Sequence, residues 1–113
     1  YGDGSQTRSF CYVDDLINGI FLMMKKENLA GPVNLGNPSE ISIYNLAQEI
    51  IDLTGSKSKI INKELPVDDP KQRCPNIEIA NKELGWQPSF DREVGLKKTI
   101  EYFDELLNKE KLK

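Results

Sequence analysis

Arginines are the scarcest charged residues of the sequence, with three among 15 basic side chains. Arg8 follows a glycine-bearing loop, and Arg73 lies in an irregular loop between prolines. A guanidinium can hold a phosphate or carboxylate through two parallel hydrogen bonds, which an ammonium cannot do. Two loop arginines far apart in sequence could therefore clamp one pyrophosphate, although solvated surface arginines are the simpler interpretation of these two residues alone. Arg92, in the first turn of an expected helix, is interpreted as a surface residue.

Several other chemistries are excluded by residue type. The chain has no histidine and only two cysteines, Cys11 and Cys74. A Ser-His-Asp or Cys-His nucleophile therefore lacks its base, and a zinc site of Cys and His ligands is not expected. The adjacent carboxylates Asp14-Asp15 and Asp68-Asp69 are interpreted as helix-start and turn residues, so no metal site is predicted. We interpret the cysteines as small buried side chains in a reducing compartment, which predicts a cytoplasmic location.

Nicotinamide chemistry has no visible site in this sequence. A dinucleotide fingerprint requires GxGxxG, but Gly2-Asp3-Gly4 is followed by Thr7 where the third glycine should stand. No Gly-Lys-Ser/Thr of a P-loop occurs, and none of the four tyrosines is followed four residues later by lysine. We therefore expect no catalytic and no cofactor-binding residue in this chain.

Length and charge limit the partners. The 113 residues suffice for one domain, residues 1–113, with a net charge of −3. An acidic chain is a poor match for a nucleic-acid backbone, and the longest apolar run, residues 20–24, is far shorter than the roughly 20 residues of a membrane span. Neither a nucleic acid nor a membrane is expected as a partner.

Hydrophobic periodicity predicts alternating strands and helices. Short strands are expected at residues 8–12, 32–36 and 59–62. An apolar stripe from Val13 to Met24 predicts the first helix, and residues 43–51 predict the second, capped by Ser42 and stopped by Gly55. Two more helices are expected at 76–84, closed by Gly85, and after Asp91. The last helix should turn an apolar face toward a core, with side chains Val94, Leu96, Ile100, Phe103 and Leu107.

This order of elements predicts an α/β fold with a short, partly parallel sheet and about four helices. So narrow a sheet leaves one flank uncovered. We therefore expect the chain to pack against another layer, either a further part of a longer polypeptide or a second copy in a homo-oligomer.

Four stretches occur together in an order typical of one enzyme group: residues 1–17 (YGDGSQTRSFCYVDDLI), 31–38 (GPVNLGNP), 68–75 (DDPKQRCP) and 84–88 (LGWQP). On these motifs the chain resembles the nucleotide-sugar epimerase/dehydratase branch of the extended short-chain dehydrogenase/reductases. Two details make the UDP-glucuronate decarboxylases the most similar subfamily. Arg8 is followed by Ser9, where many epimerases and dehydratases have aspartate, and the DDPxQRxP string is typical of the decarboxylases. One departure is Asn76, where that subfamily usually carries aspartate.

The resemblance implies a division of labour. In that family an N-terminal Rossmann domain binds NAD, and a C-terminal part closes over the nucleotide sugar. This chain matches only the C-terminal, substrate-binding part, so the Rossmann domain is expected to be absent from it, and no NAD binding or decarboxylation is expected from the chain alone.

The resemblance also assigns roles to individual residues. Arg8 and Arg73 match positions that contact the diphosphate or the sugar acid. Tyr1 and Gly2 match the turn that lines the uridine site, and Gln6 lies close to them. The implied function is the UDP-sugar-binding half of an NAD-dependent UDP-glucuronate decarboxylase. The alternatives are part of a related epimerase or dehydratase, or a non-catalytic module for binding or self-association.

Overall fold

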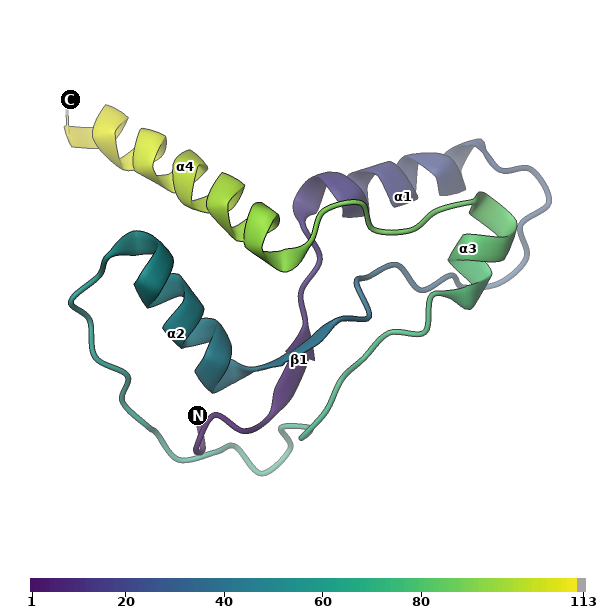
Figure 1. The fold of residues 1–113 in the computed structure, drawn as a ribbon. Coiled ribbons are helices and arrows are strands. Elements are labelled where there is room, and N and C mark those ends of the chain that lie inside the picture. The colour runs from purple at the N-terminus through teal and green to yellow at the C-terminus, as the bar shows by residue number, and fades with distance from the viewer. Residues whose placement is uncertain (112–113) are drawn as a thin grey trace.

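The computed structural model describes residues 1–111, which form two short strands and four helices. The elements in chain order are β1 (Thr7–Ser9), α1 (Val13–Lys25), β2 (Glu40–Ser42), α2 (Ile43–Thr54), α3 (Glu78–Leu84) and α4 (Arg92–Lys111). The two strands lie at the centre, with α1 and α3 on one side and α2 and α4 on the other (Figure 1). The predicted number and order of helices are confirmed.

The predicted helix ends are also confirmed. The Ser42 hydroxyl accepts a hydrogen bond from the backbone N–H of Asn45, which caps α2. The carboxylate of Asp91 accepts one from the N–H of Val94 at the start of α4. Gly55 and Gly85 end α2 and α3 in the left-handed conformation, with φ of 63° and 61°.

The sheet differs from the prediction. Strands β1 and β2 are antiparallel, with Arg8 opposite Ile41. The parallel pairing in the described residues is an isolated bridge between Thr7 and Gln72. A partly parallel sheet is therefore not confirmed, because the segment that runs parallel to β1 is too short to form a ladder.

Two predicted strands are wrong. Residues 32–36 and 59–62 form no strand, although both contain the short apolar stretches that predicted one. A strand exists only where a neighbour supplies the other half of a hydrogen-bonded ladder. Residues 32–36 instead pack through side chains, and residues 59–62 run beside the N-terminal loop, where Lys63 accepts a backbone hydrogen bond from Gly2.

The best-packed region, here called the Trp86 core, comprises Asp15, Gly19, Leu35, Ala80 and Trp86. Trp86 is 1% exposed, and its indole N–H donates to the backbone oxygen of Asp15 at 2.9 Å. A Cβ atom at Gly19 would lie 2.9 Å from Leu35 and 3.1 Å from Trp86, so a glycine is required where α1 meets these side chains. Trp86 thus joins α1 to the segment after α3 and anchors the packing between them.

Asp15 does more than its position at a helix start predicted. Its carboxylate is 3% exposed and accepts three hydrogen bonds from the segment before α4. Oδ1 accepts from the N–H and hydroxyl of Ser89, and Oδ2 accepts from the N–H of Phe90. Burial alone would raise the pKa of Asp15, but these hydrogen bonds outweigh it and hold the pKa below its usual value. The exposed neighbour Asp14 has no such partners in the described residues.

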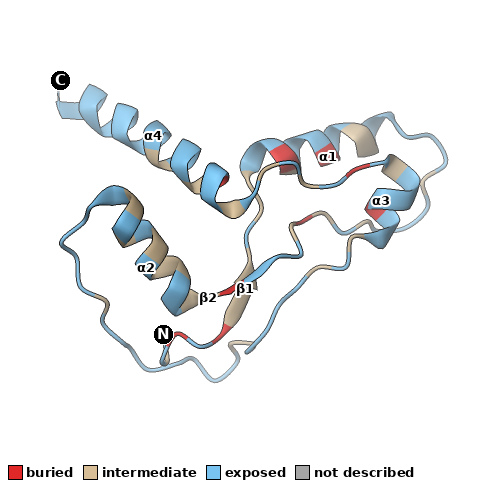
Figure 2. Ribbon diagram, viewed as in Figure 1, coloured by how far each residue is buried: buried red, intermediate tan, exposed pale blue. Residues whose placement is uncertain are grey.

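Much apolar surface remains uncovered, and buried positions are few (Figure 2). The accessible area is 8674 Å², against about 6,300 Å² for a compact monomer of 12.8 kDa. The radius of gyration is 17.1 Å, against about 13 Å expected for this length. The chain is therefore an open, flat body, 50 by 41 by 22 Å, and not a closed globule.

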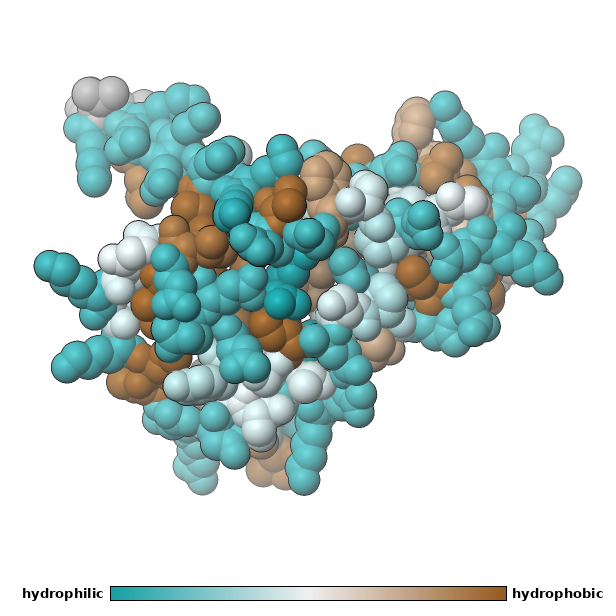
Figure 3. Space-filling view, viewed as in Figure 1, coloured by the Kyte–Doolittle hydropathy of each residue, from teal (hydrophilic) through white to brown (hydrophobic). Residues whose placement is uncertain are grey.

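The helix stripes account for this uncovered surface. The exposed apolar residues of α1 are Val13, Ile17, Ile20, Phe21 and Met24. On α4, two of the residues predicted to face a core, Leu96 and Ile100, are half-buried. The other three, Val94, Phe103 and Leu107, are exposed, so the prediction is wrong for them. Apolar side chains accordingly reach the surface in several places (Figure 3). Within residues 1–111, no helix combines the length and apolar character needed to cross a bilayer.

Candidate functional site

Arg8 and Arg73 line the same hollow, here called the arginine cleft, with a volume of about 880 Å³. Its walls come from β1, from α1 and the segments on either side of it, and from the loop before α3. They are residues Arg8, Ser9, Cys11, Leu16, 33–36 and 72–76. Two of the three arginines lie there, and none of these lining residues is acidic. A chain with net charge −3 thus presents a cationic cleft suited to an anion.

The loop that carries Arg73 is fastened along β1. The backbone N–H of Thr7 donates to the carbonyl of Lys71 at 2.9 Å, and the Ser9 hydroxyl donates to the carbonyl of Arg73 at 3.3 Å. The amide of Gln72 donates to the carboxylate of Glu40 on β2 at 2.8 Å. Residues more than 60 positions apart are therefore held side by side, which brings the two arginines into one cleft.

The Arg8 side chain is partly immobilised. Nη1 donates to the backbone oxygen of Thr7 at 2.7 Å, and Nη2 donates to Oδ1 of Asp69 at 2.7 Å. The Arg8 and Asp69 side chains are 20% and 29% exposed. Arg73 is exposed, and its guanidinium has no hydrogen-bond partner within residues 1–111. The cleft therefore contains one oriented and one uncommitted guanidinium.

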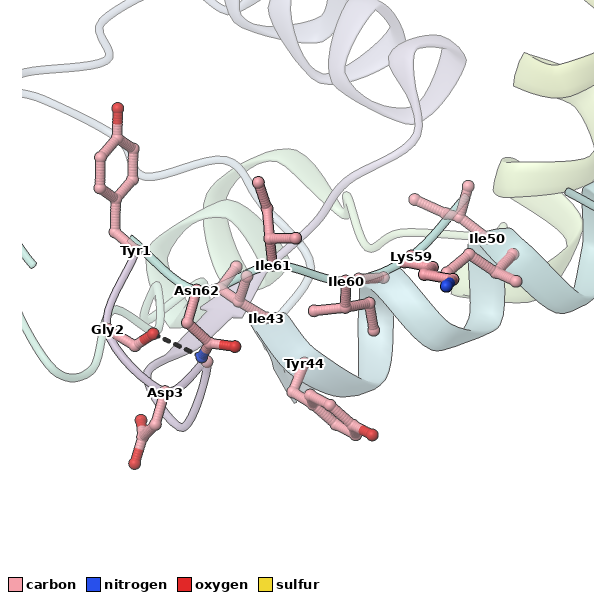
Figure 4. Close-up of a pocket in the computed structure, with 13 residues that line it drawn as sticks. Tyr1, Gly2, Asp3, Ile43, Tyr44, Ile50, Lys59, Ile60, Ile61 and Asn62 are labelled. Carbon is pink, nitrogen blue, oxygen red and sulfur yellow. Dashed lines mark hydrogen bonds between the residues drawn. The ribbon is translucent and has the colours of Figure 1, made fainter. Parts of the chain in front are cut away.

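Tyr1 and Gly2 lie elsewhere. They line a second pocket of about 390 Å³ between the N-terminal loop, α2 and residues 59–62. Figure 4 shows residues 59–62 running beside α2, with the Asn62 amide bonded to the Gly2 carbonyl at 2.7 Å. Ile43, Tyr44 and Ile60 are among its mostly apolar walls. This pocket could receive a flat apolar group with a polar edge.

Gln6 is 8% exposed, and its side-chain amide donates to the backbone oxygen of Tyr1 at 2.9 Å. It lines a further hollow that includes Gly2 and Lys71. Of the five predicted substrate residues, the structure thus brings Arg8 and Arg73 into one cleft and Tyr1 and Gly2 into a pocket. Gln6 shapes the N-terminal loop between them.

Arg92, interpreted from the sequence as a surface residue, is only partly exposed and forms an ion pair. Its Nε donates to Oε2 of Glu49 at 2.8 Å, and the two side chains are only 29% and 21% exposed. The pair joins α4 to α2. Sequence reasoning missed it because Glu49 and Arg92 are 43 positions apart and share no local motif.

The interpretation of both cysteines as buried side chains is also wrong. Cys74 is exposed, Cys11 is half-buried, both are free, and both line the arginine cleft. Burial, followed by the negative charge of Asp15, raises the pKa of the Cys11 thiol. The Cys74 thiol donates to the carbonyl of Pro38 at 3.3 Å.

Metal and cofactor chemistry find no support in these residues. In the described part of the chain, no three His, Cys, Asp or Glu side chains come together as a metal-binding group. The glycine loop at residues 2–4 forms no helix N-terminus for a pyrophosphate, since β1 follows it. This glycine loop therefore does not fit the pyrophosphate of a dinucleotide.

Comparison with known proteins shows which family these features resemble. Residues 1–36 match the NAD dependent epimerase/dehydratase family. The resemblance to this family is confirmed. UDP-glucuronic acid decarboxylase 1 of Danio rerio is 50% identical over 103 residues, 91% of this chain and 24% of the relative. A UDP-glucuronic acid decarboxylase 1 of Arabidopsis thaliana is 38% identical over 111 residues, 97% of this chain and 25% of the relative. The chain spans about a quarter of the length of these curated relatives.

Solved structures of the family have the same arrangement of elements. A UDP-glucose 4-epimerase of Thermotoga maritima, solved with UDP-glucose, superposes with a TM-score of 0.86 at 30% identity, over 95% of this chain and 34% of the epimerase. A UDP-glucuronic acid 4-epimerase of Bacillus cereus, in complex with UDP-glucuronic acid and NAD, gives a TM-score of 0.82 at 32% identity, over 94% and 34% of the two chains. These Rossmann-type enzymes therefore contain the fold described above as one part of a longer chain.

Proposed function

We propose that this chain is the nucleotide-sugar-binding part of an NAD-dependent UDP-glucuronate decarboxylase, which converts UDP-glucuronate to UDP-xylose and carbon dioxide. The observation that carries the proposal is the arginine cleft: Arg8 and Arg73, 65 positions apart in an acidic chain, line one hollow without an acidic lining residue. The identity to two UDP-glucuronic acid decarboxylases, 50% and 38%, supports the choice of reaction.

The cleft has the chemistry for a diphosphate. Arg8 and Arg73 would neutralise its charge and bind its oxygens, and each charge-assisted contact is worth about 1.5–3 kcal/mol. The pocket at Tyr1 and Gly2 would take the uridine, whose ring has an apolar face and a polar edge. In this arrangement Gln6 supports the uridine pocket through the backbone of Tyr1.

NAD would be bound outside this chain. There it would supply the redox chemistry of the reaction, and the chain's own residues would bind and orient the UDP-sugar. The 113-residue chain by itself is therefore expected to release no carbon dioxide from UDP-glucuronate. A cytoplasmic location belongs to the same proposal, since both cysteines are free.

The large exposed apolar surface indicates that a further layer of protein packs against this chain. The excess of about 2,400 Å² over a compact monomer of this mass is about three times the roughly 800 Å² that each partner buries in a standard protein–protein interface. We propose that a Rossmann domain occupies this surface and makes residues 1–113 the C-terminal domain. A second copy of the chain is the alternative partner.

A related epimerase is the second candidate function. The similarity to a UDP-glucuronic acid 4-epimerase solved with UDP-glucuronic acid favours it, since an enzyme of either kind must recognise the same acid. Binding of UDP-glucuronate therefore tests the substrate class. The product, UDP-xylose or UDP-galacturonate, would distinguish the two reactions in a full-length enzyme.

Calorimetric titration of the chain with UDP, UDP-glucuronate and NAD as separate ligands tests the proposal. We expect the two uridine nucleotides to bind and NAD not to bind. Absence of UDP binding would contradict a complete substrate site in this chain, and binding of NAD alone would contradict the division of labour.

A further inference from the structure

We propose that Asp69 is a positioning residue that orients the Arg8 guanidinium for an oxyanion in the arginine cleft. This inference rests on the proposed function, because the oxyanion is the diphosphate of a UDP-sugar. Asp69 stands in a pair of aspartates whose sequence indicated only a turn. The structure shows instead that Asp69 reaches back across 61 positions to Arg8, at 2.7 Å.

Asp69 is well placed to hold another side chain still. Its backbone N–H donates to the carbonyl of Pro66 at 3.2 Å, which closes a turn, and Pro70 fixes the backbone immediately after it. The loop then continues along β1 through the Thr7–Lys71 hydrogen bond. The carboxylate is thus fixed relative to the strand that carries Arg8.

The contact leaves most of the guanidinium available. A guanidinium has five N–H groups. In Arg8, one bonds to the Thr7 carbonyl and one to Asp69, and the other three have no partner within residues 1–111. Arg8 also lines the cleft. Asp69 therefore removes rotational freedom from Arg8 before any ligand arrives and leaves N–H groups free for two phosphate oxygens.

The same loop carries Arg73 four residues further on. Glu40 holds this part of the loop through Gln72, and Asp69 holds its beginning through Arg8. Asp69 consequently influences both arginines: it orients one and helps to fix the segment that presents the other.

Asp69 is also an anion beside a proposed anion site, so its two possible effects have opposite signs. If the carboxylate merely competes with the diphosphate for Arg8, then neutralising it by Asp69→Asn strengthens UDP binding. If it positions Arg8, the same substitution weakens UDP binding. We expect weakening of about tenfold, equivalent to the loss of one well-oriented charge-assisted contact.

Titration of the full chain with UDP and with uridine measures this sign. Asp69→Asn should weaken UDP and leave uridine unchanged, since uridine lacks the diphosphate. The matched control is Asp68→Asn, an exposed neighbour with no side-chain hydrogen bond in the described residues, which should change neither affinity. In Arg8→Ala, adding Asp69→Asn should produce no further loss. Unchanged or tighter UDP binding by Asp69→Asn would overturn the inference, as would an equal loss of uridine binding.

Nitrogen NMR of the arginine side chains gives a readout independent of UDP. Only three guanidiniums need assignment, and that of Arg8 should rotate slowly in the parent chain and rapidly in Asp69→Asn. If the parent chain binds no UDP, the proposed function fails. The positioning of Arg8 by Asp69 is still supported if the Arg8 guanidinium rotates slowly in the parent chain and rapidly in Asp69→Asn, and it is overturned if the rotation is unchanged.

If Asp69→Asn does not fold, Arg8→Lys is the test variant, because lysine keeps the charge but cannot form the two parallel hydrogen bonds of a guanidinium. It should then lose UDP affinity about as strongly, and an affinity equal to the parent's would overturn the inference.

Discussion

The Trp86 core and the arginine cleft both contain charged side chains, but these charges have different roles. In the core, the Asp15 carboxylate accepts three hydrogen bonds and is 3% exposed, so its bonding capacity is directed into the chain. In the cleft, Arg8 uses two of five N–H groups and Arg73 uses none within residues 1–111. A satisfied, buried charge stabilises the fold, whereas a half-satisfied charge at a cleft is available to a ligand.

The largest effect should come from removing the centre of the core. Trp86→Ala deletes the largest fully buried side chain and the hydrogen bond to Asp15. We expect a loss of about 3–5 kcal/mol in the free energy of unfolding, measured by urea denaturation. Met24→Ala is the control: Met24 is 79% exposed, and the change should stay within about 0.5 kcal/mol. Similar losses in both variants would contradict a core centred on Trp86.

Asp15→Asn should lower the free energy of unfolding by about 2–3 kcal/mol. The asparagine amide cannot accept all three hydrogen bonds, so a buried donor is left unpaired. The adjacent, exposed Asp14→Asn should cost about 0.5 kcal/mol, the size of a helix-dipole contribution. Since folding lowers the pKa of Asp15, its contribution is present above the unfolded pKa of about 3.9 and is lost as the pH falls through the lower folded pKa. Urea denaturation from pH 7 to pH 2 should show the difference between wild type and Asp15→Asn shrinking in acid. A difference that is constant with pH would contradict the role of the ionised carboxylate.

The cleft should respond mainly in affinity, with a loss of stability no larger than that of a partly exposed ion pair where Arg8 is removed. Arg8→Ala and Arg73→Ala should each weaken UDP binding about 10- to 100-fold, because each removes a charge-assisted contact. Calorimetric titration measures the loss, and Lys82→Ala on the surface of α3 is the control.

Arg92→Ala should leave UDP affinity unchanged but lower the free energy of unfolding by up to about 1 kcal/mol, because it breaks the pair with Glu49. Equal affinities for all these variants would contradict a two-arginine site.

The smallest expected effect is a difference in thiol reactivity. Burial and the nearby Asp15 raise the pKa of Cys11, so less of it is thiolate at neutral pH. Cys74 is exposed and should be alkylated several-fold faster than Cys11, as measured by mass spectrometry. Because Cys74 lines the arginine cleft, saturating UDP should slow its alkylation, whereas uridine should protect it less. A Cys74 rate unaffected by UDP would place the ligand elsewhere.

Local signals in the sequence determined the helices and their ends. Ser42, Gly55, Gly85 and Asp91 act within a few residues of where they stand, so their effect can be predicted without knowing what lies across the fold. Four ordered motifs likewise indicated the resemblance to the epimerase/dehydratase family, and the comparisons confirm that resemblance.

Only the tertiary structure decided the contacts that join distant segments. The sequence could not show that residues 32–36 lack a strand partner, that Asp15 binds Ser89 and Phe90, or that Asp69 reaches Arg8. Each depends on which segment the folded chain places alongside another, and no local preference encodes that choice. The sequence by itself indicated that Arg8 and Arg73 are candidate ligands of an anion. Only the tertiary structure places them in one cleft, because residues 69–74 lie along β1 and backbone hydrogen bonds there join segments 65 positions apart.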